Sequence, residues 1–115
     1  IDPATSYYDG YLGVDFSRHE VTVAGQPVLL TRTEYNLLAY LIKNAGRLVP
    51  YRLLLTKVWG PDYEEETDYL RVYVRRLRAK IEPDPDHPQY IITHRGFGYR
   101  FVCRPMPAAQ LHQWA

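Results

Sequence analysis

Hydrophobic residues recur with helical spacing near the middle of the chain, between residues 67 and 82. At about 100° per residue, one narrow stripe collects Leu70, Val74, Leu77 and Ile81. This is the pattern of a helix that buries one face against a core. The spacing therefore predicts a helix over residues 67–82, and its opposite face is available for another role.

Two more helices are predicted upstream. Residues 31–34 form a capping box, in which Thr31 caps the helix and Glu34 bonds back to it. The helix that follows carries its apolar residues on one face, at Tyr35, Leu38, Leu41, Ile42 and Ala45, and Gly46 is expected to end it in the C′ position. Pro50 suits the first turn of the next helix. That helix bears Leu54, Leu55, Val58 and Trp59 and is expected to end at residues 60–61.

Short runs of β-forming residues flank the helices. Residues 12–16, 20–23 and 28–30 predict three or four short antiparallel strands, with a turn at residues 24–27. Prolines at 83, 85 and 88 end helical structure, and the runs 90–94 and 99–102 are joined by residues 95–98 into a hairpin. The order predicts an α+β winged helix-turn-helix, with a small N-terminal antiparallel sheet, a three-helix core and a C-terminal β-hairpin wing. We expect the domain to span residues 11–103, with 1–10 a linker or N-terminal tail and 104–115 a C-terminal tail.

Composition supports one ordinary globular domain. The 115 residues are 46% apolar and 23% charged, and no apolar run approaches the roughly 18 residues of a membrane span. The lone Cys103 cannot form an internal disulfide, which favours a reducing compartment such as the cytoplasm. The chain begins at Ile1 without a methionine, so we expect a piece of a longer protein that lacks a partner domain.

Charge gives the outward face of the third helix its chemistry. Between Arg71 and Lys80 there are five cations and no acid, although the formal net charge of the chain is only +1. The outward face holds Val72, Arg75, Arg76 and Ala79, and its rims hold Arg71, Tyr73, Arg78 and Lys80. A cationic helix of this kind fits the major groove of DNA, which admits one α-helix. The alternatives are a solvated face, or a winged-helix protein-interaction module that docks an acidic partner. RNA is disfavoured because its major groove is too deep and narrow for a helix.

Each cation suggests a particular contact. Arg75 and Arg76 are suited to the N7/O6 edge of guanine, and Val72 to a thymine methyl. Arg71, Arg78 and Lys80 are better placed for phosphates, unless Arg71 and Arg78 form salt bridges with Glu82 or with the acidic loop that precedes the helix. At the hairpin tip, Arg95 is expected to enter a minor groove. Phe97 either packs under the wing or is exposed, and we assign it to the core.

The acidic loop contains Glu64, Glu65 and Glu66. Carboxylates near a helix N-terminus gain from the helix dipole, but three in a row would repel DNA. We expect this loop to face away from the duplex, and hypothesise that it contacts a basic surface of RNA polymerase. No enzyme chemistry, cofactor or metal site is predicted, because the histidines at 19, 87, 94 and 112 lack metal-ligand spacing and no nucleotide-binding or nucleophile motif occurs.

Five collinear segments carry further motifs: Leu30–Leu38 (LTRTEYNLL), Asn44–Arg47 (NAGR), Val58–Gly60 (VWG), Arg75–Glu82 (RRLRAKIE) and Thr93–Phe101 (THRGFGYRF). In order and spacing they resemble the DNA-binding effector domain of OmpR/PhoB-type two-component response regulators, over about residues 12–103. Asp68–Val74 (DYLRVYV) is most similar to the KdpE branch. The resemblance implies a transcription factor of the bacterial cytoplasm, associated with the nucleoid when bound. Its missing N-terminal receiver would be phosphorylated on aspartate, and a homodimer would bind direct repeats in promoter DNA.

The resemblance also implies roles for individual residues. The positions that touch bases or major-groove phosphates match Val72, Tyr73, Arg75, Arg76 and Arg78. On the wing, Arg95 matches the minor-groove position, and Thr93 and Tyr99 match positions near the backbone. Trp59 matches a tryptophan that lies near a phosphate. Tyr51 replaces a frequent arginine that supports phosphate binding, and the neighbouring Arg52 is its expected substitute. Residues 60–67 match the loop through which some members contact RNA polymerase or its sigma subunit.

Overall fold

Four short strands at the N-terminal end of the computed structural model form an antiparallel sheet in the order β1-β2-β3-β4. They are β1 (Ser6–Tyr8), β2 (Leu12–Asp15), β3 (Glu20–Val23) and β4 (Gln26–Val28). The structure describes residues 6–104. In β2, Leu12 and Val14 are buried while Gly13 and Asp15 are partly exposed, so one face of the sheet packs on the core. The turn before β4 is shorter than predicted, because β4 begins at Gln26, within the predicted turn, and only Ala24 and Gly25 remain as the turn.

The prediction that residues 1–10 are a linker is wrong for residues 6–10. Residues 6–8 form β1, which pairs with residues 13–15 of β2. Asp9 is buried and its carboxylate accepts hydrogen bonds from the backbone N–H groups of Tyr11 and Leu12 and from the hydroxyl of Tyr90. Three residues are too few to show an alternating pattern, and the bond to Tyr90 joins positions far apart in the sequence. Residues 1–5 and 105–115, where the predicted linker and tail also fall, lie outside the described residues.

Three helices follow, as the hydrophobic spacing predicted: α1 (Arg32–Lys43), α2 (Tyr51–Val58) and α3 (Thr67–Ile81), with a 3₁₀ turn, η1 (Pro61–Tyr63), between the last two. The capping box of α1 is confirmed: Thr31 Oγ1 accepts the N–H of Glu34, and Glu34 Oε1 accepts the N–H of Thr31. The α1 helix ends at Lys43 with Asn44 as its C-cap, so Gly46 lies one residue beyond C′ and not at C′ as predicted, with a φ of 84°. The predicted apolar stripe of α3 is buried along its whole length.

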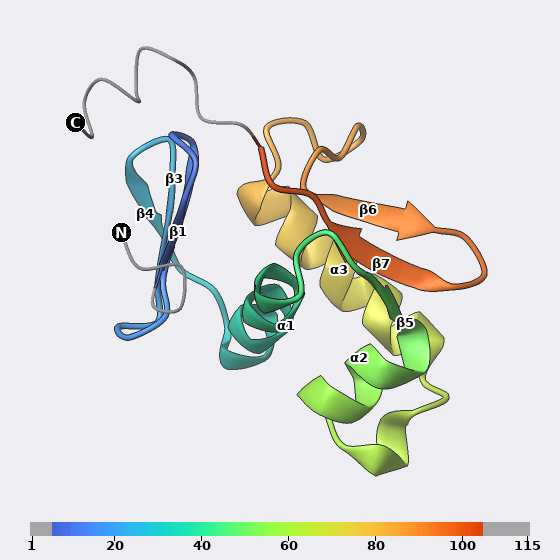
Figure 1. The fold of residues 1–115 in the computed structure, drawn as a ribbon. Coiled ribbons are helices and arrows are strands. Elements are labelled where there is room, and N and C mark those ends of the chain that lie inside the picture. The colour runs from blue at the N-terminus through green and yellow to red at the C-terminus, as the bar shows by residue number, and fades with distance from the viewer. Residues whose placement is uncertain (1–5, 105–115) are drawn as a thin grey trace.

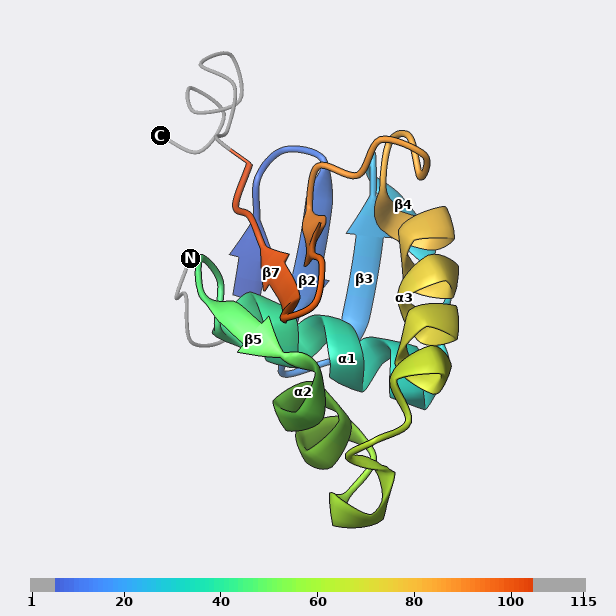
Figure 2. The same ribbon diagram turned by 90° about the vertical axis from the view of Figure 1, so that its right-hand side faces the viewer.

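The wing is a three-stranded antiparallel sheet in the order β5-β7-β6, not the two-stranded hairpin that was predicted. Its strands are β5 (Leu48–Pro50), β6 (Ile91–His94) and β7 (Gly98–Phe101). The additional strand, β5, leads directly into α2 and pairs with β7, so the wing is tied to the helix-turn-helix. Figures 1 and 2 show α1 between the N-terminal sheet and α2, and Figure 1 shows β6 and β7 running beside α3. The predicted winged helix-turn-helix is confirmed.

Candidate nucleic-acid interface

The outward face of α3 is exposed, as its spacing requires. Val72 is 43% exposed, and Arg75, Arg76 and Ala79 are exposed around it. These side chains lie opposite the buried stripe, which packs α3 against the rest of the domain. The helix therefore presents two arginines around two small side chains, and the small side chains allow another surface to approach the helix closely.

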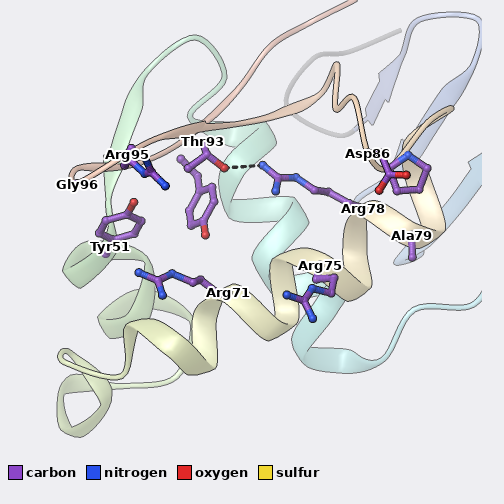
Figure 3. Close-up of a pocket in the computed structure, with 11 residues that line it drawn as sticks. Tyr51, Arg71, Arg75, Arg78, Ala79, Asp86, Thr93, Arg95 and Gly96 are labelled. Atoms are coloured by element: carbon purple, nitrogen blue, oxygen red, sulfur yellow. Dashed lines mark hydrogen bonds between the residues drawn. The ribbon is translucent and has the colours of Figure 1, made fainter.

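A groove of about 670 Å³ lies between α3 and the wing. Its lining includes six of the predicted interface residues, three from α3 and three from the wing: Arg71, Arg75, Arg78, Thr93, Arg95 and Tyr99. Figure 3 shows Arg71 and Arg75 on α3 facing the wing residues Thr93 and Arg95 across this groove. Positive side chains from two separate elements thus converge on one open groove, and the only carboxylate in its lining is that of Asp86.

Arg78 ties α3 to the wing. Its Nη2 donates to the carbonyl oxygen of Ile91 at 2.6 Å and to Oγ1 of Thr93 at 2.8 Å, and its Nε donates to the same carbonyl at 3.2 Å. The guanidinium also lies 5.8 Å from the ring centre of Tyr99. Burial lowers the pKa of Arg78 and raises the pKa of the Tyr99 hydroxyl. The structure therefore brings Arg78, Thr93 and Tyr99 together, and most of the hydrogen-bonding capacity of this guanidinium is used within the domain.

Arg71 is paired with a residue of its own helix. Its Nη1 lies 2.9 Å from Oδ1 of Asp68, one turn earlier, and not near Glu82 or the acidic loop, the partners considered from the sequence. Both side chains are largely exposed, so the pair contributes only about 0–1 kcal/mol. Arg71 is therefore free to exchange this partner for a phosphate.

Lys80 faces away from the groove, and the sequence did not indicate its partner. Its Nζ lies 2.6 Å from Oε1 of Glu34 in α1 and 3.3 Å from the carbonyl oxygen of Leu29. The Glu34 carboxylate is buried. Although burial favours its neutral form, hydrogen bonds from Lys80 and from the Thr31 N–H outweigh that effect and lower the pKa of Glu34. Lys80 thus joins α3 to the capping box of α1.

Glu82 positions the segment that leads from α3 into the wing. Its side chain is buried, and its carboxylate accepts the backbone N–H groups of Gln89, Tyr90 and Ile91 at 2.8–3.1 Å. Hydrogen bonds to a charged acceptor are among the stronger ones in proteins. Sequence reasoning treated Glu82 only as a possible partner for arginines, and no local signal marks a carboxylate that binds backbone amides seven to nine residues later.

An aromatic cluster supports the N-terminal half of α3. Trp59, which is partly buried, lies 5.6 Å from Tyr69 and 5.2 Å from Tyr73 between ring centres. The Arg76 guanidinium lies 5.2 Å from the ring centre of Tyr73. Tyr69 is 42% exposed, and sequence reasoning did not include it among the interface residues. The cluster holds Tyr73 and Arg76 in place beside the outward face.

The wing tip lies next to the start of α2. Arg95 and Gly96 are exposed, and Gly96 has a φ of 83°, which glycine adopts without strain. The prediction that Phe97 joins the core is wrong: its side chain is 67% exposed. Its N–H donates to the carbonyl of His94 in a tight turn, and Phe97 is not among the residues that pack against the core. Arg52, on the first turn of α2, is also exposed.

The acidic loop lies between η1 and α3. Glu64, Glu65 and Glu66 are all exposed, and none forms an ion pair within residues 6–104.

Among residues 6–104, no helix is long and apolar enough to cross a bilayer. Within the same residues, no three carboxylate, imidazole or thiol side chains gather in a way that could hold a metal ion.

Comparison with known proteins places this chain in a family of transcription regulators. A family model described as "Transcriptional regulatory protein, C terminal" matches residues 25–101. Transcriptional regulatory protein KdpE of Mycobacterium tuberculosis is 49% identical over 88 residues, which cover 76% of this chain and 39% of that protein. Sensory transduction protein RegX3 of Mycolicibacterium smegmatis is 45% identical over 91 residues, 79% of this chain and 40% of that protein. The chain spans about two fifths of the length of these relatives.

Solved structures agree with this comparison. Response regulator DrrB of Thermotoga maritima, described as an OmpR/PhoB homologue, has a TM-score of 0.76 at 33% identity, covering 86% of this chain and 45% of that chain. The DNA-binding domain of Klebsiella pneumoniae RstA, solved in complex with the RstA box, also has a TM-score of 0.76, at 28% identity, and covers 84% of this chain and 96% of that chain.

Proposed function

Because the chain belongs to the C-terminal transcriptional regulatory family of OmpR/PhoB-type response regulators, we propose that it binds double-stranded DNA sequence-specifically and regulates transcription as a response-regulator output domain. The family consists of transcription regulators and not of enzymes. It does not favour the alternative of a winged helix that docks an acidic protein.

One observation carries the proposal: the groove between α3 and the wing, into which Arg71 and Arg75 project from one side and Arg95 from the other. Affinity for a duplex comes mainly from cations that replace counterions on phosphates. Specificity comes from side chains that reach base edges in the major groove, where one bidentate arginine–guanine pair contributes about 1–3 kcal/mol of discrimination. Two sets of cations at different places on the domain suit a helix in the major groove and a wing tip in the adjacent minor groove.

The residues divide accordingly. Arg75, Arg76 and Val72 read bases, with Tyr73 beside them. Arg95 enters the minor groove, and Arg71 and Arg52 bind phosphates. Arg78 and Thr93 are held against each other within the domain, so we assign them the task of fixing the wing relative to α3. The same task falls to Tyr99, which is buried beside Arg78, whereas Lys80 holds α3 against α1. Trp59 supports Tyr73 through ring contact.

The partners follow from the same proposal. A receiver domain precedes this chain in the whole protein, two copies bind direct repeats of promoter DNA as a homodimer, and the protein acts in the bacterial cytoplasm. The exposed carboxylates of Glu64–Glu66 contact a basic surface of RNA polymerase or its sigma subunit. Reversing all three charges should lower promoter-dependent transcription even where promoter DNA is saturated with the protein. Unchanged transcription would remove the polymerase contact from the proposal and leave DNA binding intact.

The DNA proposal is tested by binding a labelled duplex over a range of salt concentrations. Arg71→Ala should weaken binding to every sequence and reduce the slope of log affinity against log salt by about 1, whereas Arg76→Ala should cost about 1–3 kcal/mol on a preferred sequence and relax specificity at one base pair. Arg18→Ala is the matched control, since Arg18 is exposed on the turn between β2 and β3 and should change neither. Equal losses for all three variants would contradict the proposed surface.

A further inference from the structure

Phe97 exposes most of its aromatic ring at the wing tip. Its side chain is 67% exposed, in the same turn as Arg95 and directly after Gly96. Among residues 6–104, no aromatic or cation–π contact involves this ring. A singly exposed apolar side chain is ordinary on a protein surface, but this one lies two positions from Arg95, the residue proposed to enter the minor groove.

The backbone that carries this ring is fixed. The N–H of Phe97 donates to the carbonyl of His94 at 2.9 Å, and its own carbonyl accepts the N–H of Tyr51 at 3.1 Å. The second bond satisfies an N–H in the first turn of α2, where the N-cap residue Pro50 offers no side-chain cap. The tip is therefore anchored to α2, and the backbone that carries Phe97 is in place before any partner binds.

The next residue tightens this anchor. A Cβ atom on Gly98 would lie 2.0 Å from the carbonyl oxygen of Val49, so β7 approaches β5 as closely as a glycine allows. Because the backbone on both sides of Phe97 is held in this way, a small shift of the hairpin does not bury the ring. Its exposure is a property of the fold.

We propose that Phe97 is an apolar wedge that enters the DNA minor groove together with Arg95 and packs into a base step there. This inference rests on the proposed DNA-binding function and deepens it. A cation in a narrow minor groove is held by its negative potential, and apolar side chains inserted there partly unstack a base step and bend the duplex toward the major groove. Arg95 and Phe97, two positions apart in one turn, supply these two elements.

The wedge adds a specificity that no base-edge hydrogen bond provides. Pyrimidine–purine steps such as TA and CA/TG are easily unstacked, whereas A-tracts are stiff. We therefore expect the wing to prefer a flexible step beneath Phe97, at a position that α3 does not touch. Arg95 alone would favour the opposite, a narrow A-tract, so the preference at this position distinguishes the two side chains.

The test compares Phe97→Ala and Phe97→Leu on duplexes that share one preferred α3 sequence and differ only beneath the wing, a TA step against an A-tract. On the TA duplex, Phe97→Ala should lose about five- to thirty-fold in affinity, and Phe97→Leu, which keeps an apolar side chain, should lose much less. On the A-tract duplex both variants should bind within about two- to three-fold of the unsubstituted chain. Bending is followed by energy transfer between dyes on the two ends, and unstacking by 2-aminopurine fluorescence at the step. Both signals should fall in Phe97→Ala.

The outcomes separate the wedge from the function on which it rests. Unaltered affinity, bending and 2-aminopurine signal in Phe97→Ala, together with lost base preference in Arg76→Ala, would overturn the wedge and leave DNA binding in place. Absence of duplex binding by the unsubstituted chain would overturn both. Because Phe97 is exposed, thermal unfolding of both variants should match that of the unsubstituted chain, and this measurement excludes a folding defect as the cause of a lost signal.

Discussion

Lys80→Ala separates a structural role from a DNA-binding one. Lys80 belongs to the cationic run of α3, so the sequence suggested a phosphate contact. In the structure its Nζ lies 2.6 Å from the Glu34 carboxylate. Removing it should therefore destabilise the fold and leave the salt dependence of DNA binding unchanged.

The magnitude follows from the burial of the two partners. Breaking a fully buried ion pair costs about 3–5 kcal/mol, because one charge is left in the interior, whereas exposed pairs are worth about 0–1 kcal/mol. The Glu34 side chain is 2% exposed but that of Lys80 is 35% exposed, so water partly screens the pair. The Thr31 N–H also continues to bond the carboxylate. We expect a loss of about 1–3 kcal/mol in the free energy of unfolding.

The pH dependence of this loss has a definite sign. The pKa of Glu34 is lowered from its ordinary value of 4.5. Its charged form therefore stabilises the fold fully above pH 4.5, and this contribution disappears as the pH falls through the lower pKa of the folded state. The difference in stability between Lys80→Ala and the unsubstituted chain should be constant near neutral pH and shrink below pH 4.5.

The assay is urea unfolding across this pH range, with Lys57→Ala as the control, since Lys57 is exposed on α2 and forms no ion pair within residues 6–104. Duplex binding against salt is measured on the same proteins under conditions where both are folded. An unchanged urea midpoint for Lys80→Ala, together with a salt slope reduced by about 1, would refute the structural assignment and restore Lys80 as a phosphate contact.

Three other substitutions probe the scaffold. Leu77→Ala, in the buried stripe of α3, should lower the free energy of unfolding by about 2–5 kcal/mol through the cavity it leaves, as measured by urea unfolding; a loss below 1 kcal/mol would contradict its place in the core. Gly98→Ala should destabilise the wing by about 1–3 kcal/mol, because the added methyl group would meet the carbonyl of Val49. Amide hydrogen exchange should show faster opening of β5 and β7, and unaltered protection would argue against the close approach of β7 to β5. Arg78→Ala should lose the bonds to Ile91 and Thr93 and weaken protection of the minor groove in DNA footprints more than protection of the major groove. Arg78→Lys should not restore the minor-groove protection. Equal weakening in both grooves would indicate that Arg78 contacts DNA directly.

Local patterns predicted the elements that depend on local interactions. The stripe of α3 and the capping box at Thr31 involve residues three or four positions apart, and both were found as expected. The short strands β1 and β5 were missed because three residues show no period, and each strand exists through pairing with a neighbouring strand.

The site was harder to predict than the fold because its contacts cross the chain. Lys80 and Glu34 are 46 positions apart, and Arg78 and Thr93 are 15 apart, so helical spacing identified the cations without identifying those already paired. The sequence leaves Phe97 open between packing under the wing and exposure, and the assignment to the core is wrong. The turn that exposes it is fixed by a bond to Tyr51 in α2, which no local pattern reveals.

Selection from a random pool of duplex DNA with the purified chain at moderate salt, followed by sequencing, tests the central claim most directly. The structure predicts enrichment of one motif, with base preferences that Arg76→Ala relaxes at a single position, and direct repeats spaced by about one helical turn where two copies bind. A bound pool without any enriched sequence, the same for Arg76→Ala as for the unsubstituted chain, would contradict sequence reading by α3.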